Sequence, residues 1–492
     1  MLLLLCRGAA AHSMGVIYNL PIPFWMYAFA ASAALALSFL VVGFFVSVHN
    51  AERNFRSINL AVPNAATCSV ALSVFRTLSV FALLLTILTG LFGTANPFGN
   101  FSMTFFWIVF MLGFAYLTAL IGDVYALINP WRVICEWIER MRPGALRSRL
   151  PYPQWLGYYP ALALYMALIW LELFGHAAPR TLGIVLLAYS VLNIVGAALF
   201  GSEAWFRYGE LFAVFFRLIG KVAPFEYIAD KPHGSRSTIR LRQPFIGLLE
   251  EPADHLSIVL FVLFMLSSTA FDGVHETLPW VQVFWKFIYP QLESFIQRPY
   301  LFFVDVYYYW QWTMLWVSPF LYLALYVFFV WLMKMVAGSG RSVRELSLQF
   351  AFSLIPIAIV YNVSHYYTLL VTELPAMLRL ISDPFGFGWN LFGTARIEST
   401  PLIILADGVW HTQVGLILFG HIVSVYLAHL QALKLFPTGR NAVRSQMPML
   451  ALMVLFTTVG LWILSLPIAA GQVQDPAPSA ANPPCCHVVA RA

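Results

Sequence analysis

The chain is built from long apolar runs separated by short polar segments. Ten of these runs are long enough for a helix to cross the hydrocarbon core of a bilayer, which takes about 20 residues. They lie near residues 23–48, 77–93, 101–121, 156–175, 181–200, 255–271, 317–336, 347–372, 407–432 and 448–470. This pattern predicts an all-α fold, a polytopic transmembrane helix bundle of about ten spans that lies in a lipid bilayer.

The composition agrees with a membrane protein and divides the chain into three parts. Of the 492 residues, 60% are hydrophobic and only 10% are charged, whereas soluble domains are about 25% charged. We expect a leader or short extracytoplasmic N-terminus at 1–22, the bundle at 23–470 and a disordered extracytoplasmic tail at 471–492. The net charge of +6 does not indicate nucleic-acid binding, because basic residues collect in the cytoplasmic loops of membrane proteins.

The positions of Lys and Arg predict the orientation of the bundle. The loops that follow the odd-numbered spans carry 21 of the 28 basic residues. Because basic loops stay on the cytoplasmic side, both termini are expected outside the cytoplasm. The aromatic-rich segment 277–316 fits either an extracytoplasmic cap or a re-entrant piece, and an additional span there would reverse everything after it.

Two amphipathic stretches are expected on the inner membrane surface. They are "NPWRVICEWIERM", from Asn129, and "GELFAVFFRLIGKVAPF", from Gly209. Around the start of the second stretch, Glu203, Arg207 and Glu210 are spaced i, i+4, i+7. That spacing places them on one helix face and predicts a salt-bridged surface.

The first residues have the pattern of a secretion signal with a short apolar part. Ala9–Ala11 has the small side chains of a cleavage site, but the apolar run before it has only about six residues. If cleavage follows Ala11, His12 becomes the mature amino terminus, whose amine and imidazole suit one copper ion. The alternative is an ordinary loop histidine before span one.

Span eight contains polar residues that a lipid-facing helix does not tolerate. In "SLIPIAIVYNVSHYYTLLV", Ser353–Val371, the residues Asn362, His365 and Tyr366 are spaced i, i+3, i+4 and share one face. An unpaired polar group in lipid is destabilising by several kcal/mol, so this face must point into the bundle. Pro356 is expected to kink the helix below it.

The rise of a helix, about 1.5 Å per residue, predicts which histidines share a depth. Span eight runs outward, so His365 lies roughly 27 Å above Leu346. Span nine runs inward, so His411 lies roughly 6 Å below the outer edge, His421 near the middle and His429 near the inner side. His365 and His411 therefore share a depth, His421 lies lower but within reach, and His429 cannot join them.

We expect an outer-face pocket that gathers both catalytic and metal-binding side chains. The predicted catalytic residues are His365, Asp272 and Tyr366, where Asp272 closes span six. The predicted metal ligands are His12, His365, His411 and His421. Histidines with a carboxylate suit zinc or copper, which would lower the pKa of a bound water and supply a hydroxide nucleophile. Asp383 opens a loop with Gly and Pro that we expect to be structured and to lie beside this pocket.

Other roles for these histidines stay open. A histidine inside a membrane often bonds to a neighbouring helix without binding any ligand, and no HxxxH or HExxH spacing occurs here. His421 in the middle of the bilayer also fits a proton relay, or an axial haem ligand together with another histidine. No GxxxxGK[ST] and no GxSxG sequence occurs, which argues against ATP coupling and serine hydrolysis.

Segments spread over most of the chain resemble one family of bacterial membrane proteins. They are "HSMGVIYNLPIPFWMY", "GELFAVFFRLIGKVAPF", "STAFDG", "SLIPIAIVYNVSHYY", "SDPFGFGWNLFGTA" and "FGHIVSVYLAH". The family is that of the multi-pass fenitrothion hydrolases. The resemblance implies a protein of the bacterial inner membrane that hydrolyses a lipophilic organophosphate triester at its P–O-aryl bond and releases a nitrophenol.

The resemblance also bears on individual residues. The recurrent histidines of the family correspond to His12, His365, His421 and His429. The position of His411 holds either Tyr or His in that pattern. After the last histidine the pattern has an acidic–basic pair, where this chain has Leu430 and Gln431, and this departure argues against an inner-side role for His429.

Three functions follow from these expectations. The first is metal-assisted hydrolysis of a lipophilic small molecule that reaches the outer pocket from the bilayer. The alternative is transport or handling of a metal, copper in particular, or of a small molecule, without hydrolase activity. A non-catalytic scaffold for a partner membrane subunit is the third.

Overall fold

The computed structural model describes residues 23–45, 57–61, 65–175, 178–228, 238–296, 298–397, 406–436 and 438–466. Within this part of the chain, ten helical segments are long and apolar enough to cross a membrane. They are Phe24–Phe45, Val70–Phe92, Phe101–Ile121, Gln154–Phe174, Pro179–Phe200, Leu256–His275, Tyr300–Ala337, Val343–Glu373, Gly408–Leu435 and Gly439–Ser465. The predicted all-α, multi-span bundle is confirmed. The predicted leader 1–22 and tail 471–492 lie outside the described residues.

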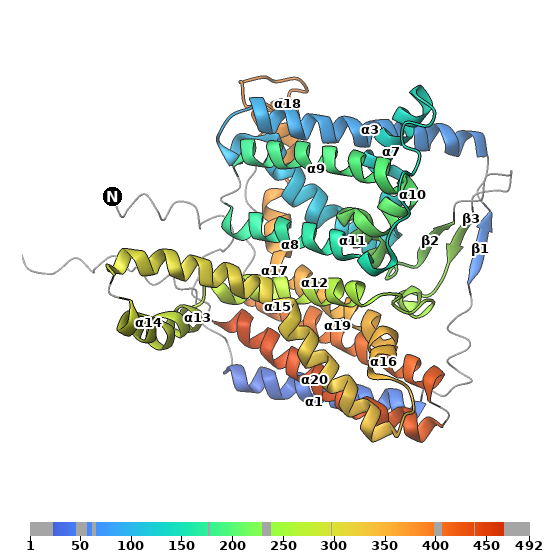
Figure 1. The fold of residues 1–492 in the computed structure, drawn as a ribbon, viewed down its shortest axis with the longest axis vertical. Helices are drawn as coiled ribbons and strands as arrows, with labels where there is room; N and C mark the ends of the chain where they lie inside the picture. Colours follow the sequence, from blue (N-terminus) through green and yellow to red (C-terminus); the bar gives the residue numbers. More distant parts are fainter. Residues whose placement is uncertain are drawn as a thin grey trace, which may run out of the picture.

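Two groups of helices make up the bundle (Figure 1). The first contains α3 (Ala65–Phe92), α8 (Tyr159–Phe174), α9 (Pro179–Phe200) and a span composed of α4 (Phe101–Met103), the π-helical η4 (Thr104–Gly113) and α5 (Phe114–Ile121). The second contains α1 (Phe24–Phe45), α12 (Leu256–His275), α15 (Tyr300–Ala337), α17 (Ile355–Glu373), α19 (Ala406–Leu435) and α20 (Gly439–Ser465). Packing of α8 on α12, and of η4 on α17, joins the two groups.

Helix α12 lies at the centre of the bundle. Within its most apolar window 83% of the residues are buried, compared with 17% for α1 and for α15. Every residue from 257 to 271 is buried, as expected for a helix that is apolar on all sides and surrounded by other helices. The last turn of α12 therefore carries its polar residues into a region enclosed by protein.

Span eight is interrupted just before its polar face. It consists of α16 (Val343–Phe350), the 3₁₀ turn η9 (Ala351–Leu354) and α17. Pro356 stands in the first turn of α17, where a helix needs no N–H donor from it. The 3₁₀ turn thus lies next to the proline at which a kink was predicted. Gly420 lets α19 approach closely at this level, because a Cβ there would lie 2.2 Å from Cγ2 of Val360.

The aromatic segment 277–316 contains no additional span among its described residues. Its first part forms α13 (Leu278–Gln282), the π-helical η8 (Val283–Ile288) and α14 (Tyr289–Phe295), which pack on the first turns of α15 through rings such as Trp285 and Tyr300, 5.1 Å apart. Helix α15 has 38 residues, about 57 Å, and is longer than the hydrocarbon core of about 30 Å. The segment is thus a helical cap on an extended span.

A small antiparallel sheet at one end of the bundle was not predicted. Strands β1 (Ile58–Ala61), β2 (Phe225–Ile228) and β3 (Thr238–Leu241) pair in the order β1–β3–β2, with Leu241 opposite both Ile58 and Phe225. The strands come from the loops after spans one and five, both of which were predicted to be cytoplasmic. We call this end of the bundle the sheet end (Figure 1).

Short helices occupy several of the loops. They are η3 (Pro97–Gly99), α6 (Tyr125–Ile128), α7 (Pro130–Met141), η5 (Gln154–Leu156), α10 (Ser202–Ala204), η6 (Trp205–Gly209), α11 (Leu211–Gly220), η7 (Ile246–Leu249) and α18 (Ala376–Ser382). Helix α7 is the amphipathic helix predicted from Asn129. It buries Trp131, Val133 and Cys135, and the side chain of Asn129 caps it by accepting hydrogen bonds from the N–H groups of Trp131 and Arg132.

Helix α11 corrects the second surface prediction. All of its residues except Ala213 and Arg217 are buried, and it packs against α5 and α8 instead of lying on the membrane surface. Glu210 does not belong to a salt-bridged surface face either, because it is fully buried whereas Glu203 and Arg207 are exposed. The hydrophobicity of α11 on nearly all sides explains why the bundle takes it up.

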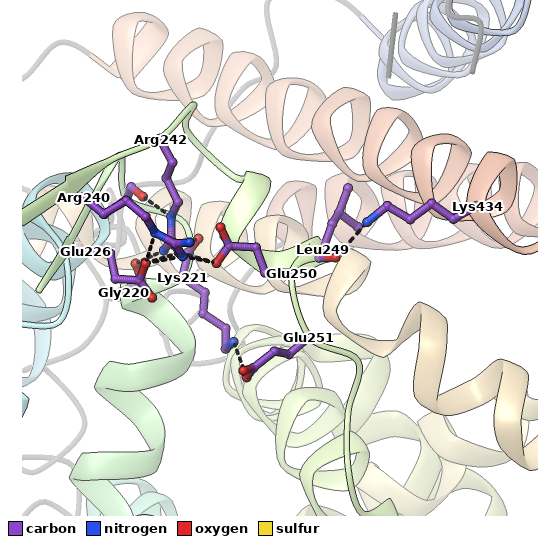
Figure 2. A network of polar contacts seen from close by, with 10 residues as sticks. Gly220, Lys221, Glu226, Arg240, Arg242, Leu249, Glu250, Glu251 and Lys434 are labelled. Atoms are coloured by element: carbon purple, nitrogen blue, oxygen red, sulfur yellow. Dashed lines mark hydrogen bonds and ion pairs between the residues drawn. The ribbon is translucent and has the colours of Figure 1, made fainter. Parts of the chain in front are cut away.

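A network of charged residues ties the sheet to the spans (Figure 2). Arg242, which directly follows β3, is buried, donates hydrogen bonds to the carbonyl oxygens of Ala223, Gly220 and Lys221, and pairs with Glu250 at 2.9 Å. Arg240 pairs with Glu226 and Glu250. In a separate contact, Nζ of Lys434 on α19 donates a hydrogen bond to the carbonyl oxygen of Leu249 in η7, at 2.9 Å. These contacts fix the sheet against the ends of α11 and α19.

Candidate functional site

The candidate site lies where α12 ends, on the side of the bundle opposite the sheet end. Asp272 stands in the last turn of α12, and its side chain is only 8% exposed. A carboxylate enclosed by helices needs donors or cations around it, because burial of an unpaired charge is strongly destabilising. The neighbouring span, α17, provides two of these partners.

Asp272 Oδ2 accepts hydrogen bonds from two residues of α17. Nε2 of His365 lies 2.9 Å away and the hydroxyl of Tyr366 lies 2.5 Å away. The rings of His365 and Tyr366 are perpendicular, with centroids 4.6 Å apart, and so make an edge-to-face contact. The structure therefore brings together the three residues predicted as catalytic: Asp272, His365 and Tyr366.

The bond to Asp272 fixes the roles of the two nitrogens of His365. Because the carboxylate accepts, Nε2 carries the proton and Nδ1 has the free lone pair in the neutral imidazole. The side chain of His365 is 21% exposed, more than that of Asp272. An imidazole held by a buried carboxylate, with its second nitrogen turned away from that carboxylate, is the arrangement of a general base.

Two further titratable residues belong to this centre and were missed from the sequence. Nδ1 of His275 donates to the backbone oxygen of Asp272 at 2.9 Å and lies 3.9 Å from Oδ1 of the same residue. Glu172 on α8 lies close enough to Asp272 for their charges to interact. The spacing of Asp272 and His275, i, i+3 on one helix, was the available signal, and for Glu172 the signal was a lone acid inside an apolar span.

The polar face of α17 points into the bundle, as predicted. Asn362, one turn before Tyr366, accepts a hydrogen bond from the hydroxyl of Tyr116 on α5 at 3.1 Å. Tyr366 itself packs against Ile108 and Leu112 of η4. The π-helical turn thus lies directly beside the site, which fixes the position of the tyrosine ring.

His411 shares the depth of His365 but not its direction. At this level α19 touches α17 through Gln413, which donates to the oxygen of Ser364 at 3.0 Å, and through the oxygen of Val409, which accepts from Tyr367 at 3.3 Å. His411 lies between these two residues, about 200° around the helix from each. It is exposed, and its ring is 6.5 Å from that of Tyr27 on α1.

His421 lies deeper and away from the centre. It is eight residues beyond Gln413 on α19, which places it about 12 Å toward the sheet end. It is buried, and Nδ1 donates to the oxygen of Ile417 at 2.8 Å. His12 lies outside the described residues. Asp383 holds its own loop, accepting from the backbone N–H of Phe387 and Gly388 at 2.9 and 2.8 Å.

The side chains around Asp272 were tested for a fit to zinc or copper. Across the described parts of the chain, no group of three or more His, Cys, Asp or Glu residues is arranged to hold a metal ion. Asp272 and His365 instead bond directly to each other. The described residues alone therefore do not form a site for either metal.

An apolar groove opens on the outer surface of the bundle. It has a volume of about 690 Å³ and lies between α8 and α15, lined by apolar and aromatic side chains such as Met166, Trp312 and Trp316. Trp312 is 6.4 Å from the ring of Phe174, which in turn is 5.8 Å from the ring of His275. Phe174 is thus in ring contact both with the groove residue Trp312 and with His275 of the Asp272 centre.

A second buried carboxyl group, near the sheet end, has a different environment. Glu210 caps α11, accepting from the N–H groups of Phe212 at 3.0 Å and Ala213 at 2.7 Å, from Nδ2 of Asn129 at 3.0 Å and from the hydroxyl of Tyr189. Burial raises the pKa of Glu210 to about 7, although these four donors act in the opposite direction. No basic side chain accompanies it among these contacts, so we assign it a structural role.

The chain was compared with family models, curated proteins and solved structures, and none of them matches it.

Proposed function

We propose that this multi-pass membrane protein hydrolyses lipophilic organophosphate triesters, with Asp272 and His365 as its catalytic pair. The observation that carries the proposal is the 2.9 Å hydrogen bond between Nε2 of His365 and Oδ2 of the buried Asp272. The same carboxylate–imidazole pairing orients the general base in many hydrolases. The resemblance of the chain to fenitrothion hydrolases names the substrate class.

In the proposed reaction, Nδ1 of His365 takes a proton from a water molecule. The water oxygen forms a bond to phosphorus while the bond from phosphorus to the aryloxy oxygen breaks, and a nitrophenolate leaves. Asp272 stabilises the imidazolium that forms, and the hydroxyl of Tyr366 holds Asp272 in place at 2.5 Å. His365 then releases its proton to solvent, which completes the cycle.

The apolar groove between α8 and α15 supports a substrate that arrives from the bilayer. A neutral triester dissolves in lipid, and the aromatic side chains Trp312 and Trp316 offer rings on which an aryl group stacks. Trp312 of the groove contacts the ring of Phe174, which contacts that of His275. A soluble substrate would need no such opening toward lipid.

The test is release of nitrophenol from a nitrophenyl phosphotriester by the purified protein in lipid nanodiscs. General-base catalysis contributes about 10²–10⁴-fold, so His365→Gln and Asp272→Asn should each lower the rate at least about 100-fold. The matched control is His411→Gln, because His411 lies at the same depth but faces away from the centre, and its rate should stay within about twofold of wild type. Release by the wild type no faster than by empty nanodiscs, or full activity of His365→Gln, would rule the proposal out.

In a second form of this proposal, a zinc or copper ion assists the hydrolysis. A metal at Asp272 and His365 would need at least one more ligand, for which His12 is the candidate outside the described residues. Elemental analysis of wild type and His365→Gln, with activity measured before and after a chelator, separates the two forms. Activity unchanged by the chelator supports the metal-free general base, whereas one bound metal that is lost in His365→Gln supports the metal form.

Transport is a second candidate function, favoured by the position of His421. This buried histidine lies in the interior of the bundle, on the sheet side of the Asp272 centre, where intramembrane ionisable residues often mark a pathway for ions or protons. Copper or proton uptake into proteoliposomes, abolished by His421→Gln and without nitrophenol release, would support this function over hydrolysis. Equal uptake by the variant and the wild type would exclude a role for His421 in it.

A further inference from the structure

A small cavity lies in the middle of the second helix group. It has a volume of about 20 Å³ and is lined by residues of α12, α15, α17, α19 and α20. Apolar side chains, among them Leu266, Ala270, Phe456 and Ile463, form most of its wall. A cavity needs roughly 10–15 Å³ to hold one water molecule, so this one has room for a single water.

Two polar atoms in the wall have no hydrogen-bond partner among the described residues. They are Nε2 of His421 and the hydroxyl oxygen of Tyr361, and the two residues are 2% and 5% exposed. Nδ1 of His421 already donates to the oxygen of Ile417, which leaves Nε2 as the nitrogen with a free lone pair. Buried polar atoms are almost always paired, with protein or with an ordered water.

We propose that this cavity binds one water molecule, which donates a hydrogen bond to Nε2 of His421 and accepts one from the hydroxyl of Tyr361. Both orphaned groups are then satisfied by one molecule of the size that the cavity admits. The two residues have complementary roles in this arrangement, because the imidazole nitrogen only accepts and the phenol donates. A purely apolar occupant would leave both groups unpaired.

The proposed water lies one helical turn away from the Asp272 centre but is separated from it. Tyr361 precedes His365 by four residues on α17. Ile463 lines the cavity and also packs against Gly273, next to Asp272, since a Cβ at Gly273 would lie 2.8 Å from its Cγ2 and 3.7 Å from Cε1 of His365. The water therefore joins α17 to α19 through hydrogen bonds in the bundle interior and gives His421 a proton donor there. This inference does not depend on the proposed hydrolysis.

The experiment measures transfer of magnetisation from water protons to the histidine nitrogens of the full-length, ¹⁵N-histidine protein in lipid bilayers. In Gly460→Ala, the added methyl group would lie 3.2 Å from the ring of Tyr361, on the cavity wall, and takes up about the space of one water. We expect a clear water signal on Nε2 of His421 in the wild type and at least a threefold loss in Gly460→Ala. The matched control is Gly415→Ala on α19, whose added Cβ meets no atom within 4 Å and should leave the signal unchanged.

A second variant keeps the test decisive if Gly460→Ala does not fold. Tyr361→Phe removes one of the two proposed partners without filling the cavity, so the Nε2 resonance of His421 should move toward that of an unbonded imidazole. A wild-type protein without water transfer to His421, or identical His421 signals in wild type, Gly460→Ala and Tyr361→Phe, would overturn the proposal. Neither outcome depends on whether the protein hydrolyses a triester.

Discussion

At the scale of single residues, a comparison of Asp272 with Glu210 shows how the surroundings of a carboxylate decide its role. Asp272 is paired with an imidazole and a phenol, groups that titrate or exchange a proton. Glu210 is surrounded by backbone N–H groups, an amide and a phenol, which fix a helix terminus. Burial alone is therefore not the sign of a site here; the basic partner at Asp272 distinguishes the two.

Tyr366→Phe tests whether the phenol supports the catalytic pair. The substitution removes one donor from Oδ2 of Asp272 and leaves the hydrogen bond from His365 in place. A hydrogen bond to a charged group contributes about 1.5–3 kcal/mol, so kcat for the triester should fall roughly tenfold or more, with little change in KM. Tyr367→Phe is the control, since that hydroxyl bonds the oxygen of Val409 on the other side of α17, and a wild-type rate in Tyr366→Phe would contradict the supporting role.

Glu210→Gln tests the structural carboxyl through its pH dependence. The pKa of Glu210 in the folded protein is about 7, above its ordinary value of 4.5, so its contribution to stability is full below about pH 4.5 and is lost as the pH rises through 7. The shift corresponds to an effect on the order of 3 kcal/mol. Between pH 5 and 8 the wild-type melting temperature should fall relative to that of Glu210→Gln, measured in detergent. Parallel melting curves over this range would contradict the assignment.

Helical spacing and depth in the membrane were sufficient to predict some of the residues of the site. Asn362, His365 and Tyr366 share a helix face, and a polar face inside lipid has to turn inward. Depth also placed His411 level with His365, but depth does not give the direction of a side chain around its helix. That direction follows from which residues of α19 touch α17, here Val409 and Gln413, and such contacts are set by the tertiary packing.

At the scale of elements, the sequence predicted the long membrane-spanning helices. It did not predict the sheet or the buried position of α11. An apolar run of about 20 residues has only one stable structure in lipid, so the ten spans follow from composition. The amphipathic pattern of α11 fits both a membrane surface and a buried position, and only its contacts with α5 and α8 decide between them. The sheet joins loops that are more than 160 residues apart in the chain, and no local sequence pattern predicts that such distant strands pair.

Arg242→Gln tests whether the sheet is fixed to the spans by the buried arginine. The change removes charged hydrogen bonds to three carbonyl oxygens and to Glu250, and we expect a loss of about 2–3 kcal/mol, because Arg240 still accompanies the glutamates. Thermal unfolding in detergent should show a lower midpoint. Arg341→Gln breaks only the exposed pair with Glu345 and should change stability by less than about 1 kcal/mol, so equal effects of the two variants would contradict the assignment.

At the scale of the whole molecule, the charged network around the sheet and the Asp272 centre lie at opposite ends of the bundle. The arginine–glutamate network, the sheet and the basic loops gather at the sheet end (Figures 1 and 2). The Asp272 centre lies at the other end, where α12 and α17 finish. With the positive-inside rule, this polarity predicts that the sheet end faces the cytoplasm and the Asp272 centre faces outward.

Cysteine labelling of intact cells tests this orientation. In a background without the five native cysteines, one cysteine replaces either Gly340, in the turn between α15 and α16, or Phe387, in the loop that begins at Asp383, both exposed. A membrane-impermeant maleimide should label Phe387→Cys in whole cells and Gly340→Cys only after the membrane is broken. The reverse pattern would place the Asp272 centre on the cytoplasmic side, so that a triester from outside would have to cross the bilayer before reaching His365.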